Sequence, residues 1–261
     1  MTCDGKRCVY GNNQLVEVIC QLRFPEIPAI QKDMPATFQE AIRQDYPQYF
    51  QRQDIAPPRI SGTPGQFRVE NSPSSVNHQF SSKDGKWRIN LSSNFISLSS
   101  RCYSSWEGFT RKLDLPLVSF IQQYSPLCFE RVGLRYINAI SRNDLGLSGM
   151  PFRALITPKY LGILSDPAIP ESSTTKCSVD TQYQISSSCH AKIHAGPGHL
   201  KQNGVDDGEV KFIYDLDLFM TGNIPVHYSV GALETIHAHA YPIFRNAITD
   251  TLHKAMAPKI F

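Results

Sequence analysis

The segment 128–140, CFERVGLRYINAI, constrains the fold more than any other part of the chain. Its residues alternate with a period of two, which is the period of a β-strand. Arg131 and Arg135 share one face of this strand, and the other face carries Val132, Leu134, Tyr136, Asn138 and Ile140. Two guanidinium groups on one face of a central strand destabilise the fold unless anionic groups meet them. The sequence therefore predicts an anionic partner here, either in the same protein or in a ligand.

Other segments alternate in the same way and predict an antiparallel sheet. Residues 14–24 form one strand that Pro25 ends, and residues 76–98 form a meander around the hairpin signal Asp84-Gly85. Strand patterns resume at 177–195 and at 209–220, on either side of a glycine-rich turn at 196–208. Regular alternation of strands and helices is missing, which argues against a doubly wound parallel sheet.

Helical spacing of apolar residues predicts long amphipathic helices that cover the sheet. The first begins near 104 with Ser104 as its cap and contains Pro116, which should kink or split it. The second runs from the cap Ser229 to about residue 256, with a bend at Pro242. Shorter helices are predicted at 35–46, capped by Asp33, and at 152–164, whereas 51–75 is predicted as a loop or an edge strand.

The resulting fold class is α+β, with antiparallel sheet covered by long amphipathic helices. The length of 261 residues fits one large domain or two small ones, and we expect halves at 1–140 and 141–261 packed as one unit. Strands followed by one long helix occur twice, at 76–124 and 177–256. A duplication and chance explain this regularity equally well, because the two halves share no sequence identity.

The composition limits the partners and the compartment. A net charge of +3 disfavours nucleic acid and anionic membranes as partners. The N-terminus has no apolar core of a signal peptide, and no window reaches the ~18 apolar residues of a membrane span. Seven scattered cysteines without a CxxC pair favour a reducing compartment. We therefore expect a cytoplasmic protein.

Asp215 and Asp217 are the first candidates to meet the two arginines. They lie in 211–220, where the alternate residues Phe212, Tyr214, Leu216, Leu218 and Met220 form an unbroken apolar face. In one reading, two arginines and two aspartates form a network that satisfies their charges within the fold. In the other reading, the same four side chains line a cleft and bind an anionic or polar ligand.

The sequence shows no motif of a known reaction. It contains no GxSxG, no phosphate-binding GxxxxGK[ST] and no HExxH, so no catalytic residue and no cofactor are predicted. His190 and His194 lie four apart on a predicted strand, too far apart for a simple zinc site, and no metal site is predicted. Asp215 and Asp217, two apart on one face, give the alternative of a Mg²⁺-dependent nuclease or phosphodiesterase.

The motifs ICQLRFP at 19–25 and RVGLRYIN at 131–138 resemble those of a sporadically distributed bacterial family of uncharacterised proteins of about this length. The resemblance extends over nearly the whole chain and includes Tyr214-Asp-Leu-Asp-Leu218. The patchy distribution of the family implies an accessory role, as in defence islands. It implies no activity, cofactor or catalytic residue.

We therefore expect a non-enzymatic binding or interaction protein of the α+β class. Its ligand is either a small anion or a partner protein, and its oligomeric state is open. The candidate binding residues are Arg131, Arg135, Tyr136, Asn138, Asp215 and Asp217. The alternative is the divalent-metal phosphodiesterase that uses Asp215 and Asp217.

Overall fold

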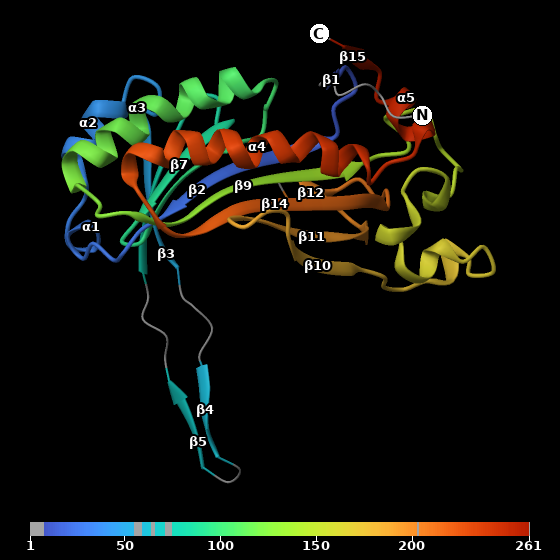
Figure 1. Cartoon of the computed structure of the whole chain (residues 1–261), viewed down its shortest axis with the longest axis horizontal. Helices are drawn as coiled ribbons and strands as arrows, with labels where there is room; N and C mark the ends of the chain where they lie inside the picture. Colours follow the sequence, from blue (N-terminus) through green and yellow to red (C-terminus); the bar gives the residue numbers. More distant parts are fainter. Residues whose placement is uncertain (1–7, 55–58, 64–65, 71–74, 203, 261) are drawn as a thin grey trace. The chain divides into compact units, whose positions relative to one another are not determined.

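The protein is known from a computed structural model that describes residues 8–54, 59–63, 66–70, 75–202 and 204–260. A sheet of nine strands has the order β10-β11-β14-β9-β2-β8-β7-β6-β3 (Figure 1). The strand pairs whose register is defined within it are antiparallel. The predicted α+β class with a large antiparallel sheet is therefore confirmed.

The strands of the sheet are β2 (Leu15–Arg23), β3 (Gln48–Asp54), β6 (Ser75–Ser81), β7 (Trp87–Ser92), β8 (Phe95–Ser100), β9 (Phe129–Ile140), β10 (Val179–Gln184), β11 (Cys189–Gly198) and β14 (Lys211–Ile224). Three small pairs are β1 (Cys8–Tyr10) with β15 (Pro258–Ile260), β4 (Arg59–Thr63) with β5 (Gln66–Glu70), and β12 (Lys201–Gln202) with β13 (Val205–Asp206). The α-helices are α1 (Ala29–Lys32), α2 (Ala36–Ile42), α3 (Trp106–Tyr124), α4 (Ser229–Arg245) and α5 (Asp250–Ala255).

The chain forms two compact units, and each combines distant stretches of sequence. Unit 1 comprises Met1–Ile19, Val132–Thr221 and Tyr228–Phe261, and unit 2 comprises Cys20–Arg131 and Gly222–His227. Strands β2 and β9 each begin in one unit and end in the other. The division at residue 140 that the sequence indicates stays a prediction.

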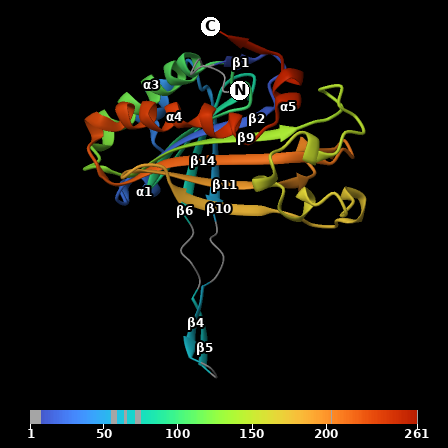
Figure 2. The same ribbon diagram turned by 45° about the vertical axis from the view of Figure 1, so that its right-hand side comes forward.

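In unit 1 the core lies on one face of β9 and β14. The apolar face of β14 is buried along its length, as its alternation predicts, through Phe212, Tyr214, Leu216, Leu218 and Met220. The rings of Tyr160 and of Phe244 in α4 both pack edge-on against Tyr214, at centroid distances of 5.3 and 5.8 Å. Figure 2 shows α4 running along one side of β9 and β14.

In unit 2 aromatic rings join the helices to the strands. Phe120 of α3 lies against Phe24 at the end of β2, with ring centroids 4.6 Å apart. Phe38 of α2 contacts Phe80 of β6 at 5.3 Å. These contacts bury the apolar stripes that helical spacing predicts on α2 and α3.

Several predicted helix ends are wrong. Ser105, not Ser104, caps α3, because its Oγ accepts a hydrogen bond from the backbone N–H of Gly108 at 3.0 Å. Pro116 lies inside α3 and does not split it. Asp33 does not cap the helix predicted at 35–46. It follows the end of α1, and Pro35 occupies the cap position of α2.

The last predicted helix is two helices. α4 starts at Ser229 without a side-chain cap and ends at Arg245, and Thr249 then caps α5 by accepting from the N–H of Leu252. The predicted helix at 152–164 is instead three short 3-10 turns, Phe152–Ala154, Pro158–Tyr160 and Gly162–Ser165. Two further turns of this kind are Glu171–Ser173 and Val226–Tyr228. Among the described residues, no helix has the length and apolar character needed to cross a membrane.

Candidate functional site

A row of charged side chains crosses the face of unit 1 that lies opposite its core. It consists of Glu17 on β2, Arg135 on β9, Asp215 on β14, His194 on β11 and Asp180 on β10. The five strands are consecutive neighbours in the sheet. The charges of these side chains therefore alternate in sign across the sheet when His194 carries a proton. We call this set the charged row, and we call the face that carries it the open face.

The strongest contact of the charged row joins Arg135 and Asp215. The guanidinium Nε donates to Asp215 Oδ1 at 2.7 Å, and Nη2 donates to Oδ2. This two-pronged geometry is the one that arginine and carboxylate prefer. The Arg135 side chain is still 47% exposed, whereas that of Asp215 is 13% exposed. The pair therefore satisfies Asp215 within the fold and leaves part of the guanidinium accessible.

The charged row continues towards the edge strand through His194. Its Nδ1 lies 2.8 Å from Asp180 Oδ1, and in the register of β11 with β14 it faces Asp215. On the same face, two residues away on each strand, Lys192 faces Asp217. Side chains directly opposite on neighbouring strands are close enough to interact. The open face is therefore patterned with both signs of charge.

The surroundings of Arg135 favour its charged form. The hydrogen bonds that Arg135 donates to Asp215 raise the pKa of Arg135, partial burial opposes this, and the charges of Asp215, Asp217 and Glu17 add to the increase. Three carboxylates thus act electrostatically on the guanidinium of Arg135, and their combined negative charge exceeds the single positive charge of this residue.

Two predicted site residues lie on the opposite, buried face of β9. The hydroxyl of Tyr136 is 2.6 Å from Nδ1 of His237 on α4, and both residues are buried. Asn138 Nδ2 donates to the backbone carbonyl of Tyr214 at 3.3 Å. Both side chains join β9 to its neighbours in the core, and the structure does not bring them together with Arg135.

Arg131 lies on β9 in unit 2, whereas Arg135 lies in unit 1. Burial raises the pKa of the Cys20 thiol to about 12, and the positive charge of Arg131 opposes part of this increase. The pairing of Arg135 with Asp215 is the part of the predicted arginine–aspartate network that the structure shows directly.

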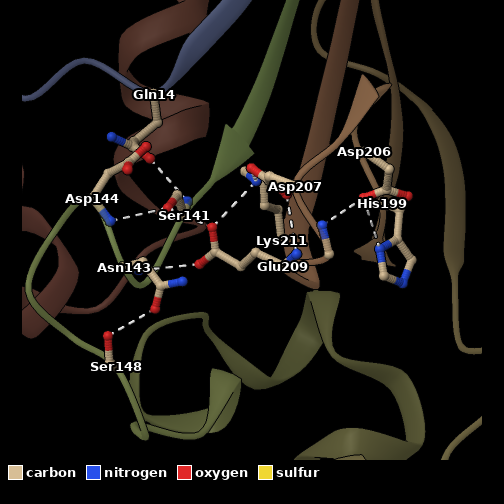
Figure 3. Close-up of polar contacts among 11 residues, drawn as sticks. Gln14, Ser141, Asn143, Asp144, Ser148, His199, Asp206, Asp207, Glu209 and Lys211 are labelled. Atoms are coloured by element: carbon tan, nitrogen blue, oxygen red, sulfur yellow. Dashed lines mark hydrogen bonds and ion pairs between the residues drawn. The ribbon is translucent and has the colours of Figure 1, made fainter. Parts of the chain in front are cut away.

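A second polar cluster at the start of β14 was not predicted from the sequence (Figure 3). Glu209 accepts hydrogen bonds from Ser141 Oγ at 2.7 Å and from the backbone N–H of Asn143 at 3.0 Å, and Lys211 Nζ lies 3.2 Å from its carboxylate. Lys211 also binds Asp207. We call these residues the lysine clamp, because they tie the loop after β9 to the first residue of β14.

Lys211 and Glu209 of the lysine clamp are far less exposed than Arg135, His194 and Asp180 of the charged row. The side chains of Lys211 and Glu209 are only 7% and 12% exposed. Burial raises the pKa of Glu209, but the bonds from Ser141, Asn143 and Lys211 outweigh it, so that the pKa lies below its usual range. Burial likewise lowers the pKa of Lys211, and its bonds to Asp207 and Glu209 raise it above the usual range. The clamp therefore holds a stable ion pair.

A metal ion would have to compete for Asp215, because both of its oxygens already bind Arg135. Within the described part of the chain, no three His, Cys, Asp or Glu residues are grouped so that they could hold a metal ion. The described geometry of the open face is therefore that of a surface with paired charges.

Comparison with known proteins gives no further assignment. No family model matches the chain, and no curated protein matches it significantly. The resemblance noted from ICQLRFP and RVGLRYIN thus stays a prediction, and the site must be interpreted from its own chemistry.

Proposed function

We propose that this chain is a non-enzymatic binding protein and that its binding surface is the open face of β2, β9, β14, β11 and β10. The observation that carries the proposal is the charged row, which extends over five neighbouring strands and stays partly or fully accessible. In this proposal α4 serves as the long cover of the opposite face. Accessible charges on a regular surface favour recognition of a partner with complementary charges.

The signs of the charges favour a polypeptide over a small anion. The open face of unit 1 carries four carboxylates, from Glu17, Asp180, Asp215 and Asp217, against the permanent cations Arg135 and Lys192. A small anion would meet this excess of carboxylates and would be repelled. An extended segment with spaced basic side chains is attracted instead, since the carboxylates of the charged row lie on every second strand, roughly 10 Å apart at ~4.8 Å per strand.

The proposed compartment is the cytoplasm, and the proposed role is an accessory one in a bacterium. The first part is supported by the described cysteines, Cys8, Cys20, Cys102, Cys128, Cys177 and Cys189, which are free thiols. The second part is supported by the resemblance to the sporadic bacterial family. No observation favours the phosphodiesterase, and it is kept as an outcome of the test.

The proposal is tested by thermal unfolding of the purified chain with four probes. These are an alternating lysine–threonine octapeptide, its glutamate–threonine counterpart, Mn²⁺ and ATP. We expect only the lysine peptide to raise Tm, because a ligand that binds the folded form alone stabilises it. The increase should disappear in the double variant Glu17→Gln/Asp180→Asn, which removes both ends of the charged row.

A matched control is Glu40→Gln/Asp33→Asn, which changes the net charge equally at exposed positions of unit 2. It should keep the full response to the lysine peptide. An equal loss in the control would show unspecific charge attraction and would contradict the proposal. If Mn²⁺ raises Tm and the chain hydrolyses bis(p-nitrophenyl) phosphate, with both effects lost in Asp215→Asn, the phosphodiesterase replaces it.

A further inference from the structure

Strand β10 ends the sheet with an open backbone edge. It pairs with β11 along 179–184, and no other described strand pairs with it. Its first residue, Val179, is partly buried, and the five residues that follow are exposed. Figures 1 and 2 show no other element of unit 1 beyond its outer side. Its outer N–H and C=O groups are therefore available to another strand.

The register identifies which backbone groups face outward. The N–H of Ile185 donates to the carbonyl of Cys189 at 2.8 Å, so this pair is a hydrogen-bonded one. Hydrogen-bonded and non-bonded pairs alternate in an antiparallel ladder. Tyr183 and Thr181 therefore bond to β11, whereas Asp180, Gln182 and Gln184 direct their N–H and C=O groups outward.

This edge lacks the features by which sheet edges usually avoid pairing. The sequence VDTQYQ contains no proline and no lysine, and the register with β11 runs through six residues without a bulge. Proline, lysine and bulges are the common means of blocking an edge strand. The edge of β10 is thus regular, polar and unblocked.

We propose that two copies of this chain pair through β10, antiparallel and about a twofold axis at Gln182. This register brings all the outward-facing residues into hydrogen-bonded pairs. Gln182 meets the partner's Gln182, and Asp180 meets the partner's Gln184. Every residue i then contacts j while j contacts i, as a twofold interface requires. The pairing does not depend on the open face acting as a binding surface.

The side chains of β10 match themselves in this register. On the face of the charged row, the amide of the partner's Gln184 donates to the carboxylate of Asp180, and no two charges of one sign meet. On the other face, Val179 meets the partner's Ile185, and the ring of Tyr183, 38% exposed, covers the partner's Thr181. Aromatic and β-branched neighbours across strands stabilise a pair.

Two neighbouring registers with the axis at an outward-facing residue are poorer. A shift of the axis to Asp180 would bring two carboxylates directly opposite each other, which destabilises a strand pair. A shift to Gln184 would leave Asp180 beyond the end of the partner's β10. Among the axes at Asp180, Gln182 and Gln184, the composition of the strand thus favours the one at Gln182.

Two lysine substitutions on the same face test both the pairing and its register. Gln182→Lys places like charges opposite each other on the axis, so the dimer Kd should rise about fivefold. Gln184→Lys places a lysine of each copy opposite Asp180 of the other copy, which adds two attractive charge pairs, so the Kd should fall about fivefold. Sedimentation equilibrium over roughly 5 to 500 µM measures both, a range suited to a small interface.

Single cysteines give a second measurement that does not depend on affinity. Gln182→Cys should crosslink to itself under mild oxidation, because the two Cα atoms lie about 5.5 Å apart in a hydrogen-bonded pair. Gln184→Cys and the wild type, which has the native thiols, should not form this crosslink. A monomer at all concentrations, or equal effects of the two lysine variants, would overturn the proposal.

Discussion

Two ion pairs on β14 use the same chemistry in opposite ways. Lys211 begins the strand with its side chain 7% exposed, and it binds Glu209, which is 12% exposed. Asp215 lies in the middle of the strand and binds Arg135, whose side chain is 47% exposed. The first pair joins the strand to a loop of its own fold, and the second leaves a cation at the surface.

The difference between these pairs lies in burial and in the number of partners. Glu209 accepts bonds from Ser141, Asn143 and Lys211, so its charge depends on groups that the fold alone supplies. Removing one partner of a buried ion pair leaves the other charge buried without a counter-charge, whereas water replaces a lost partner at the surface. The lysine clamp should therefore stabilise the fold, and the charged row should serve recognition.

Lys211→Met should have the largest effect on stability. The variant leaves the Glu209 carboxylate buried without its cation, and we expect the free energy of unfolding to fall by about 3 kcal/mol. Urea unfolding monitored by circular dichroism measures it. The matched control is Lys192→Met on the exposed face of β11, which should change stability by less than about 0.5 kcal/mol. Equal losses in both variants would erase the distinction between the two regions.

Acid should weaken the lysine clamp in a defined direction. The pKa of Glu209 lies below its ordinary value of ~4.3, so its ionised form is favoured in the folded state. Its contribution to stability is then complete above that value and is lost as the pH falls through the lower pKa of the folded state. Unfolding free energies measured between pH 7 and about pH 2 should decline on the acid side.

Glu209→Gln isolates this contribution. The variant should be less stable than the wild type at neutral pH, and its stability should decline less on acidification, because the titrating group is absent. Asp180→Asn, on the exposed charged row, is the control and should leave the acid slope close to that of the wild type. A wild-type slope in Glu209→Gln would show that Glu209 does not carry the acid response.

The sheet could be predicted because its pattern is local. Alternation in 128–140 and 211–220 fixes which side chains of β9 and β14 are buried, and the structure buries Val132, Leu134 and Leu216 accordingly. The ion pair of Arg135 with Asp215 belongs to one of the two readings of the sequence, a charge network within the fold, because unpaired charges on neighbouring strands destabilise a sheet.

The lysine clamp could not be predicted, because its members come from a loop and a strand end that no periodicity joins. Glu209 and Ser141 are 68 positions apart, and only the folded chain brings them together. Tyr136 and Asn138 join the candidate site through the motif RVGLRYIN, although the alternation of β9 places them on the face opposite Arg135.

The predicted helix ends were wrong for a related reason. Ser104 and Ser105 are equally good caps by residue type, and only the hydrogen bond to Gly108 distinguishes them. Thr249 followed by Asp250 was a usable signal for a new helix start, because threonine favours the cap and an acidic residue favours the first turn.

The assignment of the charged row to binding is tested most directly by a double-mutant cycle of Arg135→Ala and Asp215→Asn, measured by urea unfolding at low and high salt. We expect a coupling of about 0.5 to 1 kcal/mol that shrinks in ~1 M NaCl, because the pair is accessible to water. Each variant should fold normally. A coupling of about 3 kcal/mol or more that is insensitive to salt would make the pair a structural element of the sheet and would contradict the assignment of the charged row to binding.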